Sequence, residues 1–308
     1  IRDLDGAILK IVEEKDASEI EKEVSEINSG VFLFDLSALI DALTRITTAN
    51  AQKEEYLTDV IGILKSDGKK VAVYCIEDFT EILGINDRSQ LADCAALMRD
   101  RINQALMMSG VSIQDPLTTW VDVSAEIDAD VTLLMGSSIS GQTKIATGAT
   151  IGPRTTLIDT VVAKDAQVVE SFCHDSKIGT KAVVGPYSHL RNGTVLAGES
   201  KVGSFVEMKN ATLGTGSKVP HLSYVGDATI GAESNIGAAT VFVNYDGVEK
   251  HHTTVGDHVR IGSDSMLVAP VTIGDGAYTA AGSVITEDVP PGAMGIGRSR
   301  QVNILGWV

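Results

Sequence analysis

Basic side chains and a histidine gather in one short stretch of this sequence. Arg191 and Lys209 are 18 positions apart, and His221 follows within the segment VPHLSY. Guanidinium and ammonium groups bind phosphate oxygens, so a stacked pair of them favours an anionic substrate. A histidine is neutral near pH 7 and can accept a proton from a reacting group. The alternatives are a solvated surface pair and an inert surface histidine.

Further candidate side chains surround this stretch. Glu207 could orient the imidazole of His221 through a hydrogen bond. His251, His252 and His258 allow a zinc site, but no carboxylate motif accompanies them. The remaining polar candidates are Tyr224, Asn235, Asn244, Tyr245 and Lys250.

A six-residue repeat must position these residues. Aliphatic side chains recur in the same frame from Val121 onward, and several are followed by glycine, as in IGAESN and IGDGAY. This period predicts a parallel β-helix in which each hexad forms one strand and one corner, and three hexads close one coil. Coils stack about 4.8 Å apart, so Arg191 and Lys209 are expected to lie on neighbouring coils.

The repeat has one interior set of residues and several interruptions. The repeat changes frame at several points, and residues 243–254 depart from it, which predicts a projecting loop. The predicted inward side chains are Val121, Ile127, Leu133, Ile139, Ile145, Ile151, Leu157, Ile178, Val184, Leu190, Leu196, Val202, Met208, Leu213, Val219, Val225, Ile230, Ile236, Val255, Ile261, Leu267 and Ile273.

The amino-terminal third has a different pattern. Apolar runs at 31–35 and 69–75 predict strands, and helical spacing predicts helices over 36–46, 56–64 and about 87–109. Alternating strands and helices indicate an α/β architecture. We therefore expect part of an α/β, Rossmann-like domain over residues 1–112, which includes the linker helix, and a β-helix domain over 113–308. The sequence starts without Met, and we expect its first domain to be incomplete.

Composition restricts the partners of the chain. The net charge of −16 argues against nucleic acid and anionic membrane surfaces as partners. Three cysteines without metal-type spacing suit a reducing cytoplasm. No apolar run reaches the ~18 residues of a transmembrane helix, so no membrane partner is expected.

Several segments together resemble one bacterial enzyme family. GPYSHLRNGTVL, VGSFVEMKNATLGTGSKVPHLSYVGDATIG and SNIGAATVFVNYDG resemble the acetyltransferase domain of the bifunctional N-acetylglucosamine-1-phosphate uridyltransferase / glucosamine-1-phosphate N-acetyltransferase (GlmU) family. EINSGVFLFD and GINDRSQL resemble the later part of its uridyltransferase domain. The ending Trp307-Val308 is similar to actinobacterial members. The resemblance implies a left-handed coil and a homotrimer with sites between subunits.

The resemblance implies acetyl transfer from acetyl-CoA to glucosamine 1-phosphate, for UDP-N-acetylglucosamine and cell-wall precursor synthesis. It makes His221 the general base, Glu207 its orienting partner, and the backbone N–H of Ala238 the oxyanion donor. The implied glucosamine 1-phosphate ligands are Arg191, Lys209, Tyr224, Asn235, Asn244 and Lys250. The implied acetyl-CoA ligands are Ala238, Asn244, Tyr245, Ser263, Ala281, Arg298 and Trp307.

The resemblance also covers the amino-terminal region. Glu13 and Asn28 match positions that hold the N-acetylglucosamine group, and Asn86 matches a magnesium ligand of the complete domain. The family's glycine-rich nucleotide loop has no counterpart in these 308 residues, so we expect this chain not to use UTP. Two other functions remain open: a catalytically degenerate trimerising β-helix scaffold, and a metal-dependent hydratase on the same fold.

Overall fold

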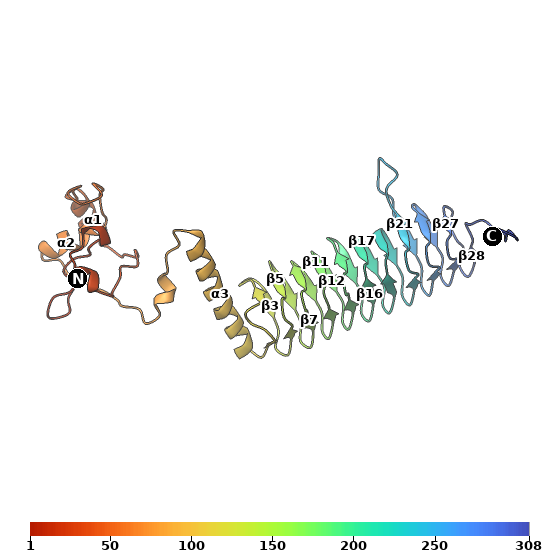
Figure 1. The fold of residues 1–308 in the computed structure, drawn as a ribbon, viewed down its shortest axis with the longest axis horizontal. Helices are drawn as coiled ribbons and strands as arrows, with labels where there is room; N and C mark the ends of the chain where they lie inside the picture. The colour runs from red at the N-terminus through yellow and green to blue at the C-terminus, as the bar shows by residue number, and fades with distance from the viewer. Residues whose placement is uncertain (308) are drawn as a thin grey trace. The chain divides into compact units, whose positions relative to one another are not determined.

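The computed structural model describes residues 1–307, and Val308 of the actinobacterial-like ending lies outside them. Contacts divide the chain into two units, Ile1–Cys94 and Ala95–Val308. The predicted linker helix is confirmed as α3 (Arg88–Met108), which runs across this division (Figure 1). Within the described residues, no helix has both the length and the apolar character needed to cross a bilayer.

The first unit consists of short helices around a small apolar core. Its helices are η1 (Glu14–Asp16), η2 (Glu21–Glu23), α1 (Leu36–Leu43), α2 (Asp59–Ser66) and η3 (Phe79–Ile82). α1 begins at Asp35, whose side chain accepts a hydrogen bond from the N–H of Ala38 at 2.9 Å. Val60 and Leu64 of α2 pack in one cluster with Ala42 of α1. Both predicted helices of this unit are therefore confirmed, although α1 ends earlier than predicted and α2 begins and ends later.

Neither of the two strands expected in the first unit is formed. Residues 31–35 and 69–75 have no strand partner among the described residues. A strand needs a neighbour to satisfy its backbone N–H and C=O groups. Leu33 and Tyr74 are both exposed, so these runs are not buried in an apolar layer either. The helices of the predicted α/β pattern are present without its sheet.

The second unit is a coil of parallel strands stacked in three columns (Figure 1). The first stack is β1 (Ser112–Ile113), β4 (Thr132–Leu133), β7 (Thr150–Ile151), β10 (Gln167–Val168), β13 (Val183–Val184), β16 (Lys201–Ser204), β18 (Lys218–His221), β20 (Asn235–Ile236), β23 (Arg260–Ile261), β26 (Tyr278–Thr279) and β28 (Met294–Gly295). Neighbours in this stack pair one coil apart, as Val202 does with Val219.

The other two stacks share β17 (Glu207–Leu213) and β19 (Tyr224–Ile230). The second stack also contains β2 (Trp120–Val121), β5 (Ser138–Ser140), β8 (Thr156–Ile158), β11 (Phe172–His174), β14 (His189–Leu190), β21 (Val241–Val243), β24 (Met266–Val268) and β27 (Val284–Ile285). The third contains β3 (Glu126–Ile127), β6 (Lys144–Ile145), β9 (Val161–Val162), β12 (Ser176–Ile178), β15 (Thr194–Leu196), β22 (Thr253–Val255) and β25 (Val271–Ile273).

Aliphatic side chains of the hexads fill the interior of this coil. Every predicted inward residue except the partly buried Ile127 is buried in one continuous cluster. Each such side chain contributes about 1.5–3 kcal/mol when it leaves water. At the amino-terminal end, Ile102 and Leu106 of α3 pack on this cluster, and the Asn103 amide donates to the carbonyl of Thr119 at 2.9 Å. The parallel β-helix predicted from the repeat is confirmed.

The changes of frame are tight corners. Where the interval between inward residues falls from six to five, the chain turns through a residue with positive φ. Asp159, Asp175, Asn210 and Asp227 hold four such corners, with φ of 47°, 45°, 46° and 49°. Asp and Asn tolerate this backbone region better than most residues. β17 and β19 therefore run around their corner unbroken, and Asn210 stacks on Asp227.

One segment projects from the coil. It lies between β21 and β22 and is visible above β21 in Figure 1. Tyr245 and Lys250 form an antiparallel bridge within it. The coil resumes where Thr253 pairs with Ala228, so the loop adds residues without disturbing the stack. The projecting loop expected over 243–254 is confirmed.

Candidate active site

His221 lies at a corner, as the last residue of β18. Its carbonyl oxygen accepts hydrogen bonds from the N–H of Ala239 at 3.3 Å and from Ser223 Oγ at 2.8 Å. Its ring is exposed and has no hydrogen-bond partner within residues 1–307. The backbone is thus held by neighbouring coils while the imidazole is free to exchange a proton with a ligand.

The same corner on the coils that follow His221 holds three predicted acetyl-CoA ligands, Ala238, Ser263 and Ala281, which we call the corner column. The carbonyl of Ala238 accepts from the N–H of Asp264 at 2.7 Å, and the carbonyl of Ser263 accepts from the N–H of Gly282 at 2.8 Å. Ala281 precedes that glycine at the same corner of the following coil. The backbone N–H of Ala238 donates to no acceptor in the described part of the chain. This corner column therefore offers an unused donor one coil from the histidine.

Glu207 forms an ion pair with Arg191. Arg191 Nη1 donates to Glu207 Oε1 at 2.7 Å, and both side chains are partly exposed. The strand register places Glu207 opposite Tyr224 on the next coil. The carboxylate that the resemblance assigns to orienting His221 thus has the arginine as its partner in this structure.

Three cationic side chains converge at the next corner along this face. The ladder pairs Leu190 with Met208, which places Arg191 beside Lys209 on adjacent coils, as the 18-residue spacing predicts. The third is Lys250 from the projecting loop, whose ammonium group lowers the pKa of Lys209, with desolvation and Arg191 lowering it further. We call Arg191, Lys209 and Lys250 the cation cluster. A phosphate monoester would offset the repulsion within it.

Gly226 lies beside this cluster. A Cβ atom at this glycine would lie 2.5 Å from Tyr224 Oη and 2.7 Å from Asn244 Nδ2. The hydroxyl and the amide therefore meet over a position that has no side chain. Sequence reasoning singled out Tyr224 and Asn244 but missed this glycine and the Asp227 that follows it. The five-residue interval at this corner was the available signal.

Asn235 lies apart from the cation cluster, whereas Tyr245 pairs with Lys250 in the projecting loop. Asn235 is in the first stack, paired with Lys218 and Arg260, whereas Arg191 and Lys209 flank the second stack. Tyr245 is exposed in the loop, where its hydroxyl donates to the carbonyl of Gly247 at 2.7 Å. Within one subunit, the predicted substrate ligands are divided between two faces.

Arg298 and Trp307 lie in the last part of the chain. A Cβ on Gly282 would be 3.7 Å from Arg298 Cδ, so this arginine extends the corner column beyond Ala281. Trp307 is 79% exposed. It is therefore available to another molecule or another subunit.

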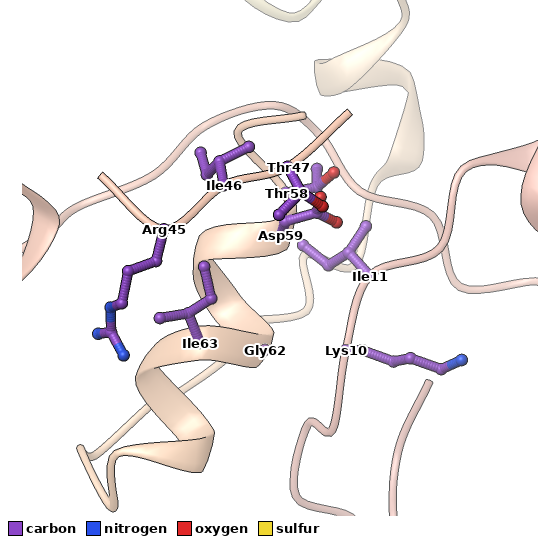
Figure 2. A pocket seen from close by; sticks show the side chains of 9 residues that line it. All are labelled: Lys10, Ile11, Arg45, Ile46, Thr47, Thr58, Asp59, Gly62 and Ile63. Atoms are coloured by element: carbon purple, nitrogen blue, oxygen red, sulfur yellow. The ribbon is translucent and has the colours of Figure 1, made fainter. Parts of the chain in front are cut away.

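The amino-terminal candidates are spread over the first unit. Glu13 Oε1 accepts a hydrogen bond from Thr58 Oγ1 at 3.2 Å, whereas Asn28 and Asn86 are exposed. A cavity of about 360 Å³ lies nearby, and none of the three lines it (Figure 2). Its lining residues are Lys10, Ile11, Arg45, Ile46, Thr47, Thr58, Asp59, Gly62 and Ile63. Burial raises the pKa of Asp59, and the charges of Asp16 and Glu13 add to that.

The side chains do not form a metal site. Residues 1–307 contain no group of three or more His, Cys, Asp or Glu side chains placed to hold a metal ion. Asn86 alone would offer magnesium a single amide oxygen, which does not fit the oxygen-rich shell that this ion requires. His251 Nε2 is 2.7 Å from Asp246 Oδ2, and His252 Nε2 is 3.0 Å from Thr229 Oγ1. These two rings therefore have hydrogen-bond partners other than a metal.

Comparison with known proteins connects this geometry to a family. The family model for bacterial transferase hexapeptide (six repeats) matches residues 252–287. Two relatives named "Bifunctional protein GlmU", from Streptomyces coelicolor and Corynebacterium jeikeium, are each 54% identical and align with 98% and 100% of this chain. The relative of that name from Mycobacterium bovis is 51% identical over the whole chain.

The chain is therefore similar to these GlmU proteins over nearly all of its own length. It spans 62–63% of the length of these GlmU relatives. All three GlmU relatives are actinobacterial, as the resemblance of the sequence predicts. Among solved structures, the UDP-N-acetylglucosamine acyltransferase of Francisella novicida is 14% identical with a TM-score of 0.28, covering 59% of this chain and 65% of that one.

Proposed function

We propose that this chain transfers acetyl from acetyl-CoA to the amine of glucosamine 1-phosphate. One observation carries the proposal: an exposed histidine with a free ring lies one coil below an unused backbone N–H and on the same face as a cation cluster. A proton acceptor, an oxyanion donor and a phosphate site are the groups that this reaction requires. The similarity to proteins named "Bifunctional protein GlmU" supports the same substrates.

The proposed reaction is direct attack of the amine on the thioester. The amine nitrogen forms a bond to the acetyl carbonyl carbon, and His221 accepts the proton that the nitrogen loses. The N–H of Ala238 stabilises the negative charge on the carbonyl oxygen of the tetrahedral intermediate. The carbon–sulfur bond then breaks, and the protonated imidazole returns its proton to the CoA sulfur. The products are CoA and N-acetylglucosamine 1-phosphate.

We also propose that the active unit is a homotrimer. Asn235 and the cation cluster flank different stacks of one subunit, so a neighbouring copy could bring the two sets together. The exposed Trp307 is suited to reach the acetyl-CoA of a neighbour in the same way. Sites completed by adjacent subunits would make activity depend on assembly.

The setting of this reaction follows from its product. We propose that N-acetylglucosamine 1-phosphate is supplied for UDP-N-acetylglucosamine and cell-wall precursors in the cytoplasm. The magnesium-dependent uridyltransferase activity belongs in this proposal to the complete protein. Glu13 and Asn28 would hold the N-acetylglucosamine group there, and Asn86 would complete a metal shell supplied by other residues.

The test measures thiol release from acetyl-CoA by the 308-residue chain. CoA is expected to appear when glucosamine 1-phosphate is present and not when it is replaced by glucose 1-phosphate, which has the phosphate but no amine. The absence of thiol release at saturating concentrations of both substrates would contradict the acetyltransferase proposal. An inactive trimer would instead support the scaffold alternative.

A further inference from the structure

We propose that Asp227 is a positioning residue: it orients the Asn244 amide with its carbonyl oxygen toward the substrate, and it balances the charge of the cation cluster. This inference rests on the function proposed above, because it names how that site would recognise an amine beside a phosphate. Asp227 makes no contact with the reacting atoms in this scheme and acts through its neighbours.

Asp227 is held between two amides. It is 8% exposed and occupies a tight corner within β19. Its Oδ1 accepts a hydrogen bond from Asn210 Nδ2 at 2.6 Å, one coil below. Its Oδ2 accepts a hydrogen bond from Asn244 Nδ2, one coil above. Each carboxylate oxygen thus has its own amide partner, which leaves the side chain little freedom to rotate.

This contact decides which way the Asn244 amide faces. An ionised carboxylate only accepts hydrogen bonds, so the NH₂ group of Asn244 must face Asp227. The Asn244 amide lies beside the open position at Gly226, where its Nδ2 and Tyr224 Oη come within 2.7 and 2.5 Å of the place a Cβ would take. Because Nδ2 is bound to Asp227, the carbonyl oxygen of Asn244 is the atom that remains to accept a hydrogen bond from a ligand. Such an acceptor recognises the N–H groups of an amine.

The same carboxylate faces the cation cluster. Burial raises the pKa of Asp227, but hydrogen bonds from Asn210 and Asn244 and the charges of Lys250 and Lys209 outweigh burial, and its pKa is lowered. In return, the charge of Asp227 opposes the lowering of the Lys209 pKa by Lys250 and Arg191. No ion pair joins Asp227 to either lysine in the described residues, and the side chains of Lys209 and Lys250 are partly exposed and exposed, respectively.

The test is Asp227→Asn, measured by calorimetric binding of glucosamine 1-phosphate, glucose 1-phosphate and inorganic phosphate without acetyl-CoA. We expect affinity for glucosamine 1-phosphate to fall about 10- to 100-fold, because an asparagine at 227 no longer fixes the Asn244 amide and removes a charge. The preference for the amino sugar over glucose 1-phosphate should fall as well. In an Asn244→Ala background, Asp227→Asn should change that preference no further.

The pH dependence separates this role from a structural one. Without the charge of Asp227, the pKa of Lys209 falls further, so phosphate affinity should be lost at a lower pH than in the wild type as pH rises. The matched control is Asp159→Asn, the same substitution at another corner with positive φ, where the carboxylate accepts a hydrogen bond from the N–H of Gln142 and is not part of the cation cluster; it should keep wild-type affinity within about threefold.

Each outcome bears on the inference separately from the proposed function. If the wild type binds phosphate but transfers no acetyl, the proposed function fails, while weaker and pH-shifted binding by Asp227→Asn still supports the role of Asp227. Unchanged affinity, preference and pH dependence in a folded variant would overturn it. If Asp227→Asn does not fold, Asp227→Gly replaces it; loss of fold in both would show a structural role and overturn the inference, as would a wild type that binds no phosphate.

Discussion

At the scale of single residues, the proposed site combines side chains that have partners with a ring that has none within residues 1–307. The backbone of His221 is anchored by Ala239 and Ser223, whereas its ring has no partner among the described residues. Glu207 is paired with Arg191 at 2.7 Å. The ring nitrogens of His221 are therefore available to a ligand.

Replacing His221 by alanine should therefore remove the proton acceptor and leave the coil intact. We expect kcat for acetyl transfer to fall by about 10²–10⁴-fold, the usual contribution of a general base. The KM for glucosamine 1-phosphate should change little, because the cation cluster remains. The matched control is His174→Ala, an exposed histidine of β11, which should turn over like the wild type. Wild-type kcat in His221→Ala would exclude the general-base role.

At the scale of elements, β17 and β19 bring the site together because they continue around a corner. Their outward side chains supply Glu207, Lys209 and Tyr224, and their corner residues supply Asn210 and Asp227. Gly226 lies between these two sets and leaves the space in which Tyr224 Oη and Asn244 Nδ2 approach each other. A side chain there would fill that space.

Gly226→Ala is expected to displace the hydroxyl of Tyr224 and the amide of Asn244, because its Cβ would lie 2.5 and 2.7 Å from them. We expect KM for glucosamine 1-phosphate to rise by roughly tenfold or more, the cost of about one lost hydrogen bond. Steady-state kinetics would measure it. Gly198→Ala is the control, since its Cβ would meet nothing closer than 3.4 Å. Equal KM values for the two variants would contradict this function of Gly226.

Much of the coil could be predicted from sequence, because one aliphatic side chain per hexad must face the interior. The stacking of Arg191 on Lys209 followed from the same count. The position of Lys250 did not, because the loop has no period and folds back on its own hydrogen bonds. The strand prediction for residues 31–35 was wrong, because an apolar run does not reveal whether a pairing partner exists. Asp227 was missed because its role depends on Asn244, which the loop brings near.

At the scale of the molecule, the β-helix is a one-dimensional stack in which each coil contacts its neighbours. Leu133 is fully buried near the amino-terminal end of the stack, several coils from His221. Stability in such a stack is close to a sum of local contributions. A defect in one coil should therefore weaken the fold without moving a distant site.

Leu133→Ala tests this separation. The cavity should lower the free energy of unfolding by about 2–5 kcal/mol. Denaturant unfolding of the wild type and the variant would measure this difference, and kinetics below the transition should show unchanged KM for both substrates. A large change in KM with a small loss of stability would mean that the distant coils are coupled to the site more strongly than a stack allows.

The loop between β21 and β22 has a consequence for how such a protein can change. Thr253 rejoins the coil opposite Ala228, so the loop residues 244–252 take no part in the ladders of the coil or in its apolar interior. Their number and composition can vary while each later coil keeps its neighbours. Because Lys250 comes from this loop, exchanging the loop would alter the cation cluster and leave the coil unchanged. The coil is then the constant framework of the protein, and the loop is the part that can vary.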